Sequence, residues 1–92
     1  MIKSFKDRDT EAVFKRVRFA RFRQIERSAR KRLLYLDSAS ELRELAVIPG
    51  NRLEALRHDR TGQYSIRVNQ QWRICFVWQK GNAHEVEIAD YH

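Results

Sequence analysis

Residues 62–92 read GQYSIRVNQQWRICFVWQKGNAHEVEIADYH, and this stretch decides the fold. Apolar and polar residues alternate in three runs that are separated by short turns, the second of which contains Gly81. A period of two is typical of strands with one buried face, so the stretch predicts an antiparallel meander. The alternation continues almost to the last residue, which predicts that the carboxyl end is held in the sheet. The final Asp90, Tyr91 and His92 are therefore candidates for a functional site.

Helical periodicity replaces this alternation in the first half of the chain. Ile25, Ala29, Leu33 and Leu36 recur at steps of four, four and three residues. This spacing places them on one side of an amphipathic helix that is expected to span about residues 24–36. The apolar side of that helix is expected to pack against the apolar face of the sheet.

Two further helices are expected from cap and spacing signals. Asp9 or Thr10 can cap the first helix, because a side-chain oxygen there accepts from the unpaired amides of the first turn. Val17 is expected on the buried side of that helix. Ser38 and Glu41 form the pattern of a capping box ahead of a short third helix.

The elements combine into one expected domain. Short strands are expected at residues 2–5 and 52–56. With the helices and the meander they predict an α+β fold over residues 1–92, with N-terminal helices packed on a mainly antiparallel sheet. No apolar run approaches the roughly 20 residues that cross a bilayer. The first residues lack the apolar centre of a secretion signal, which favours a cytoplasmic protein with no membrane partner.

The net charge of +7 is large for this length and is concentrated in one segment. Residues 15–32 contain nine basic residues and one acid, Glu26. Such a surface suits a polyanion, which can be nucleic acid, the ribosome or an acidic protein segment. The charge pattern alone does not distinguish among these three kinds of partner.

The polar face of the predicted sheet carries arginines that suit an RNA phosphate. Arg73 lies between Trp72 and Ile74, so it must point away from their core face, and Arg67 is expected on the same polar face. A guanidinium group binds two phosphate oxygens at once. Three more basic residues border this face and complete the predicted RNA-binding set: Arg57, His58 and Arg60.

Cleavage of RNA also requires proton transfer. A base must take the proton of a ribose 2′-OH, and an acid must protonate the leaving 5′-oxygen. An imidazole suits either role, so His92 is one candidate, and Glu54 is a second candidate base. Tyr91 is a further candidate, which either stacks on a nucleobase or donates a hydrogen bond. Asp90 either belongs to this catalytic group or only caps the chain end or pairs with an arginine.

Other chemistry is not indicated by the sequence. The three histidines lack the close spacing of metal ligands and the acids do not cluster, so we expect no metal site and no cofactor. The single cysteine, Cys75, lies between Ile74 and Phe76 and is interpreted as a buried apolar side chain.

A family resemblance is carried by two segments: LEALRHDRTGQYSIRVNQQWRICFVW at residues 53–78 and VEIADYH at residues 86–92. They resemble the HigB-type killer toxins of the RelE-like superfamily, from bacterial type II toxin–antitoxin modules, and the MIKSF start extends the likeness over nearly the whole chain. The resemblance implies a RelE-like fold with a curved antiparallel sheet, and ribosome-dependent cleavage of mRNA. It also implies a helix-turn-helix antitoxin of the HigA type as partner, through which the pair binds operator DNA.

The resemblance further implies roles for individual positions. Arg73 falls on the sheet arginine of the family, and residues 90–92 fall on its terminal Asp-Tyr-His motif. Arg57 stands where the family commonly has a lysine, and His58 replaces the glycine that usually follows it. Glu54 stands where some relatives have a histidine, so the role of base stays open between Glu54 and the terminal histidine.

We therefore expect a metal-independent, ribosome-dependent mRNA endonuclease that is inhibited by an antitoxin. The ribosomal A site would position the mRNA, and the toxin would supply phosphate stabilisation and proton transfer. Residues 15–32 would contact ribosomal RNA or the antitoxin. One alternative is a non-catalytic module that binds RNA or the ribosome, and another is a non-toxic partner in a repressor complex.

Overall fold

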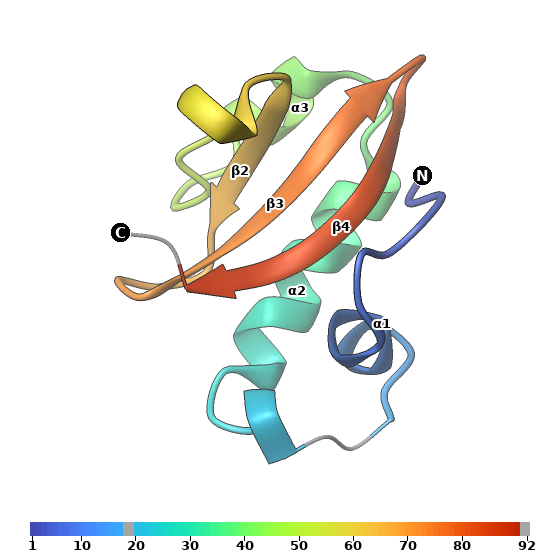
Figure 1. Ribbon diagram of the computed structural model, residues 1–92, viewed down its shortest axis with the longest axis vertical. Coiled ribbons are helices and arrows are strands. Elements are labelled where there is room, and N and C mark those ends of the chain that lie inside the picture. The colour runs from blue at the N-terminus through green and yellow to red at the C-terminus, as the bar shows by residue number, and fades with distance from the viewer. Residues whose placement is uncertain (18–19, 91–92) are drawn as a thin grey trace.

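The computed structural model describes residues 1–17 and 20–90 of the chain. Its elements in order are α1 (Arg8–Phe14), the 3₁₀ turn η1 (Ala20–Phe22), α2 (Glu26–Ser38), α3 (Leu42–Ala46), β1 (Glu54–Ala55), the 3₁₀ turn η2 (His58–Arg60), β2 (Gln63–Arg67), β3 (Trp72–Gln79) and β4 (Asn82–Asp90). The strands pass in front of α2 in Figure 1, so the helical layer lies behind the sheet. Within the described parts of the chain, no helix is long and apolar enough to cross a bilayer.

The four strands form an antiparallel meander in the order β1-β2-β3-β4. Ile66 pairs with Ile74, and Ile74 pairs with Ile88, so a row of branched apolar side chains crosses the sheet on the helix side. A register shift between Cys75 and Val77 interrupts the β3–β4 ladder, and such bulges bend a strand. Figure 1 shows β4 as a curved strand. The predicted α+β class, with helices on a curved antiparallel sheet, is confirmed.

The N-terminal segment lies along the outer edge of β4. Ile2 and Phe5 form isolated parallel bridges with Ala83 and Val86, where an edge strand was expected. The Lys3 amide donates to the Ala83 carbonyl at 2.8 Å. These bonds satisfy backbone groups of the last strand that would otherwise offer an edge for pairing with another chain.

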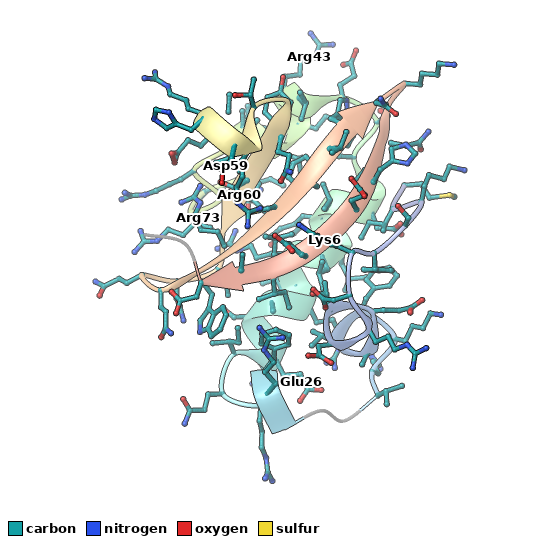
Figure 2. The ribbon with its side chains drawn as sticks, viewed as in Figure 1. Lys6, Glu26, Arg43, Asp59, Arg60 and Arg73 are labelled. Atoms are coloured by element: carbon teal, nitrogen blue, oxygen red, sulfur yellow. The ribbon has the colours of Figure 1, made fainter. Side chains whose placement is uncertain are left out.

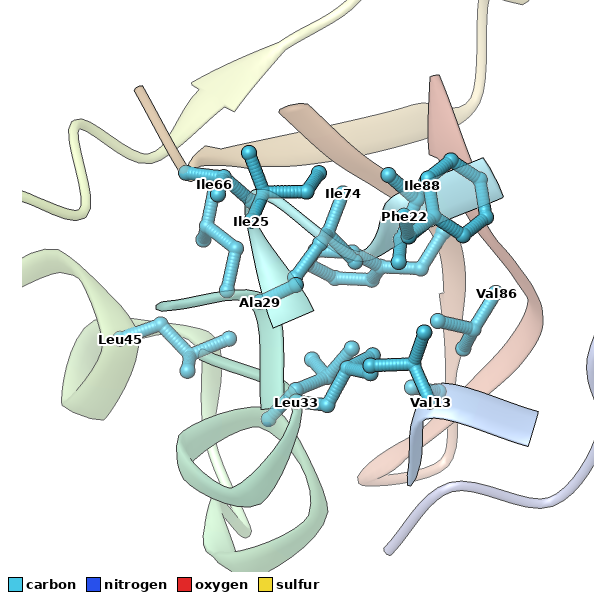
Figure 3. Close-up of a cluster of buried hydrophobic side chains, with 14 of the residues drawn as sticks. Val13, Phe22, Ile25, Ala29, Leu33, Leu45, Ile66, Ile74, Val86 and Ile88 are labelled. Carbon is cyan, nitrogen blue, oxygen red and sulfur yellow. The ribbon is translucent and has the colours of Figure 1, made fainter. Parts of the chain in front are cut away.

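The core lies between the helices and the sheet (Figure 3). Ala29, Leu33 and Leu36 of α2 are fully buried, which confirms the side of the helix that the four-, four- and three-residue spacing predicted. The prediction for Val17 is wrong, since its residue is 56% exposed. The reason is that α1 ends at Phe14, so Val17 lies beyond the helix and outside its apolar stripe.

The cap of α1 differs from both residues expected to form it. Asp7 is the N-cap, and its carboxylate accepts from the Thr10 amide at 2.7 Å. Thr10 is instead fully buried, and its Oγ1 accepts from the Ile88 amide of β4 at 2.9 Å. Thr10 therefore joins α1 to the sheet, because it satisfies a backbone donor that no strand reaches.

The capping box of α3 begins three residues later than the sequence pattern indicated. Glu41 is the N-cap, and Glu44 at the third helical position accepts from the Glu41 amide at 2.6 Å. Glu44 also accepts from the side chain and amide of Ser40, and these bonds are the main reason that the pKa of Glu44 is lowered. Ser38 instead ends α2, so the predicted box was assigned to the wrong helix terminus.

We predict that Thr10→Val lowers the free energy of unfolding by about 1–3 kcal/mol, because the buried Ile88 amide loses its acceptor. Thr10→Ser keeps the oxygen and removes one methyl group, so it should cost only about 1 kcal/mol. Urea denaturation followed by circular dichroism measures both values. Equal losses for the two variants would show that packing, and not the hydrogen bond, explains the buried threonine.

Candidate active site

Arg73 is the centre of the candidate site and projects from the sheet face that is turned away from the helices. Its Nε donates to Ser65 Oγ at 2.7 Å, and its Nη2 donates to the Arg52 carbonyl at 2.8 Å. The Glu54 carboxylate lies 3.5 Å from the same Nη2. The Arg73 side chain is only 12% exposed, so a charged group is held in place at the sheet surface by three neighbours.

Arg67 faces Arg73 directly across the β2–β3 ladder. Like charges in this arrangement repel and are destabilising. Arg67 Nε donates to the Asn69 carbonyl at 3.1 Å, which also fixes this side chain near the hairpin turn. The pair therefore concentrates positive charge at one end of the sheet face and favours binding of an anion.

An open hollow of about 290 Å³ lies beside the two arginines. Six residues line it: Arg52, Glu54, Arg67, Asn69, Gln70 and Arg73. Glu54 joins them because it pairs with Ser65, which brings its side chain to the face of Arg73. Three of these six residues were expected at the site from the sequence: Glu54, Arg67 and Arg73.

Sequence reasoning missed Arg52, Asn69 and Gln70 as residues of this hollow. Arg52 stands two residues before Glu54, so strand alternation would have placed both on one face. Asn69 and Gln70 lie in the turn between the strands that carry the two arginines, and a hairpin turn necessarily borders the ends of its strands.

Arg60, one of the expected RNA-binding residues, is held in an ion cluster. Its Nη1 lies 2.8 Å from Glu87 Oε1, and Lys6 Nζ approaches the other oxygen at 3.6 Å. The close contact with the Glu87 carboxylate is the main reason that the pKa of Arg60 is raised. Figure 2 shows Arg60 and Lys6 over the same part of the sheet face. The cluster holds η2 against the sheet. Arg57, which precedes η2, and His58, its first residue, are exposed to solvent.

Cys75 lies on this face between Arg60, Glu87 and Arg73 and is fully buried. Burial is the main cause that raises the pKa of its thiol, and the nearby arginines oppose this rise only in part. A neutral, inaccessible thiol is a poor nucleophile. The interpretation of Cys75 as a buried apolar side chain is confirmed.

The structure does not bring Asp90 and Arg73 to the same face of the sheet. Asp90 pairs with Trp72, whereas Arg73 pairs with Ala89. Directly paired residues point to the same side, and Trp72 packs on the helix side against the ring of Phe22. Asp90 Oδ2 accepts from Gln71 Nε2 at 3.1 Å.

Tyr91 and His92, the other two residues of the expected terminal motif, lie outside the described residues. Among residues 1–17 and 20–90, no group of three or more His, Cys, Asp or Glu side chains is placed to hold a metal ion.

Four of the nine basic side chains in residues 15–32 are engaged by neighbouring groups, three of them by carboxylates. Four pairs account for this: Lys15 with Glu11 at 2.9 Å, Arg21 with Asp9 at 2.9 Å, Arg30 with Glu26 at 2.7 Å and Arg32 with Asn51 at 2.7 Å. Arg30 also donates to the Val13 carbonyl and so ties α2 to α1. The basic surface that a polyanion can reach is therefore smaller than the charge count indicates.

The fold is shared with toxins of known structure. Staphylococcus aureus YoeB in its heterotetrameric toxin–antitoxin complex with YefM superposes with a TM-score of 0.62 at 21% identity, covering 100% of this chain and 98% of that chain. The YoeB dimer from the same organism superposes with a TM-score of 0.56 at 18% identity, covering 99% and 97%. The molecule thus has the α+β fold of the RelE-like toxins.

Sequence comparison narrows this class to one family. Residues 3–92 match the family of RelE-like toxins of type II toxin–antitoxin systems called HigB, so the chain belongs to the HigB family. Endoribonuclease HigB of Proteus vulgaris is 35% identical over the full length of both chains. Toxin HigB-1 of Vibrio cholerae is 42% identical over 59 residues, which span 64% of this chain and 62% of that protein.

We predict that the Cys75 thiol is alkylated at least about 100-fold more slowly in the folded protein than in the unfolded one, because the reagent needs an exposed thiolate. Iodoacetamide labelling at pH 8, followed by mass spectrometry with and without guanidinium chloride, measures the ratio. Rapid labelling of the folded protein would mean that the Arg60–Glu87 cover opens readily.

Proposed function

We propose that this HigB-family toxin cleaves mRNA on the ribosome and that Arg73 holds the phosphate at which the chain is cut. The observation that carries the proposal is the direct pairing of Arg67 and Arg73 beside an open hollow. Like charges on directly paired positions are destabilising, and a bound anion offsets this repulsion. An RNA phosphate supplies that anion, and the name of the relative Endoribonuclease HigB supports RNA as the substrate class.

The chemistry is transfer of the phosphoryl group within the RNA. The 2′-oxygen attacks the adjacent phosphorus, the bond from phosphorus to the 5′-oxygen breaks, and the products carry a 2′,3′-cyclic phosphate and a 5′-hydroxyl. Negative charge gathers on the phosphoryl oxygens during this step, and a preorganised cation stabilises it there. Arg73 fits that role, since its partners hold it before the substrate arrives.

Glu54 is the proposed base and His92 the proposed acid. Glu54 lines the hollow 3.5 Å from Arg73, so a phosphate bound there places the 2′-OH within reach of its carboxylate. His92 then protonates the leaving 5′-oxygen, and Tyr91 stacks on a neighbouring base. Asp90 belongs to the other face of the sheet by its register, so we propose for it a role at the strand end and not at the phosphate.

The proposed partners follow from the family. Residues 1–92 act as one toxin domain in the cytoplasm, where the ribosomal A site positions the mRNA. A helix-turn-helix antitoxin neutralises the toxin, and the pair contacts operator DNA through the antitoxin. Arg57, His58 and the exposed residues of the basic segment, among them Arg23 and Arg27, contact RNA around the hollow or along α2.

We predict that Arg73→Ala lowers the rate of mRNA cleavage on programmed ribosomes by at least about 100-fold, since it removes the cation at the developing charge. Arg43→Ala is the matched control, because Arg43 is a solvent-exposed arginine of α3. Mapping of 5′ ends by primer extension measures both rates. Wild-type protein that binds ribosomes without producing new ends would support the non-catalytic module instead.

We predict that Glu54→Gln slows cleavage by about 100-fold or more, because the amide cannot accept the 2′-OH proton. Glu11→Gln on α1 removes an exposed carboxylate away from the hollow and should cleave at the wild-type rate. Single-turnover kinetics on the ribosome compares the two. Unchanged cleavage by Glu54→Gln would transfer the role of base to His92.

A further inference from the structure

We propose that Ser65 and the turn at residues 49–52 form a bracket that fixes the guanidinium group of Arg73 before RNA binds, with Ser65 and Asn51 as positioning residues. The inference rests on the proposed function of Arg73, because a cation that stabilises the phosphate must already be in position. Arginine has a long, flexible side chain, and a group that is ordered in advance does not lose this freedom when the substrate arrives.

The bracket forms hydrogen bonds with two of the three guanidinium nitrogens of Arg73. Ser65 Oγ accepts from Nε at 2.7 Å, and the Arg52 carbonyl accepts from Nη2 at 2.8 Å. Among the described residues, no hydrogen bond engages Nη1. The two held nitrogens fix the plane of the guanidinium group, so the remaining donor is presented in a defined direction.

The Arg52 carbonyl depends on an unusual backbone conformation. Arg52 has a φ of 45°, in the left-handed region that residues other than glycine seldom adopt. Such a conformation persists only where the surroundings hold it. Here it turns the chain between the helical layer and β1 and directs a carbonyl at Arg73.

Asn51 supplies that support from three sides. It is fully buried, and its Nδ2 donates to the Leu45 carbonyl at 3.1 Å. Arg32 of α2 donates to Asn51 Oδ1 at 2.7 Å, and the backbone carbonyl of Asn51 accepts from the Arg67 amide at 2.6 Å. The turn is therefore fastened to α2, to the end of α3 and to β2, and Arg52 follows it directly.

Gly50 allows the turn to approach α2 this closely. Its φ is 84°, and a Cβ atom at this position would lie 2.9 Å from Arg32 Nη2. A larger residue would be strained by this φ and would displace the end of the Arg32 side chain, which holds Asn51. Glycine at this point therefore lets the turn adopt this conformation without strain and without displacing the Arg32 side chain.

Ser65 is placed for Arg73 and not for packing alone. It is fully buried in the middle of β2, where an alanine would fill nearly the same space. In the described part of the chain, the hydrogen bond of its hydroxyl oxygen is with Arg73 Nε. A buried hydroxyl needs a partner, so the pair is mutually dependent.

The first test is a double-mutant cycle measured as single-turnover cleavage at saturating toxin on programmed ribosomes. Ser65→Ala should slow cleavage about tenfold in the native background, since a small misplacement of a catalytic group is costly. In the Arg73→Lys background, which has no Nε, the same change should alter the residual rate less than about twofold. An equal factor in both backgrounds, or no effect in either, overturns the proposal.

The second test needs no RNA and so separates the bracket from the proposed activity. The Nε–H resonance of Arg73, identified by its loss in Arg73→Lys, should exchange slowly with water in the native protein. Ser65→Ala should accelerate that exchange at least about tenfold. Asn51→Ala should also accelerate it, whereas Asn82→Ala in the β3–β4 turn should not.

The outcomes of the two tests are distinguishable. Unchanged exchange in Ser65→Ala overturns the bracket whatever the cleavage assay gives. If the native protein shows this exchange pattern but does not cut mRNA, the proposed function is contradicted and the bracket stands. Arg73 would then be positioned to bind a different anion. Thermal unfolding of Asn51→Ala shows whether the variant is still folded at the temperature of the exchange measurement. Faster exchange in a folded variant supports the positioning role of Asn51, whereas loss of the folded state counts against it.

Discussion

The register between β2 and β3 is the constraint on which the rest of the molecule depends. Ile66 pairs with Ile74 on the helix side, and the next pair, Arg67 with Arg73, lies on the other side. A shift of one residue would exchange the two faces, exposing the isoleucines and burying the arginines. The free energy gained by burying apolar side chains therefore holds the arginines in place, although they repel each other.

Each layer of the fold contributes to the site through this register. Burial of α2 sets the position of Arg32, which fastens the turn at Asn51 and thereby the carbonyl at Arg52. The outer face is not a bare polar surface, because the Arg60–Glu87 pair covers Cys75 and anchors the η2 loop beside the hollow.

Several features were predictable from the sequence because they depend on local periodicity. The meander, the buried side of α2 and the outward direction of Arg73 all follow from side-chain spacing. The caps were not predictable, since several polar residues stand near each helix start and tertiary contacts choose among them. Thr10 has the chemistry of a cap, but the unpaired amide of Ile88 lies close enough to take its hydroxyl.

The sequence by itself determined the α+β class, the basic character, the family resemblance and the strand that carries Arg73. Only the tertiary structure decided which charges act together. It brought Arg52 and the carboxylate of Glu54 to Arg73, assigned Arg60 to Glu87, and placed Asp90 on the opposite face. The physical reason is that spacing specifies the direction of a side chain, whereas an ion pair or hydrogen bond requires distances between residues that are remote in the chain.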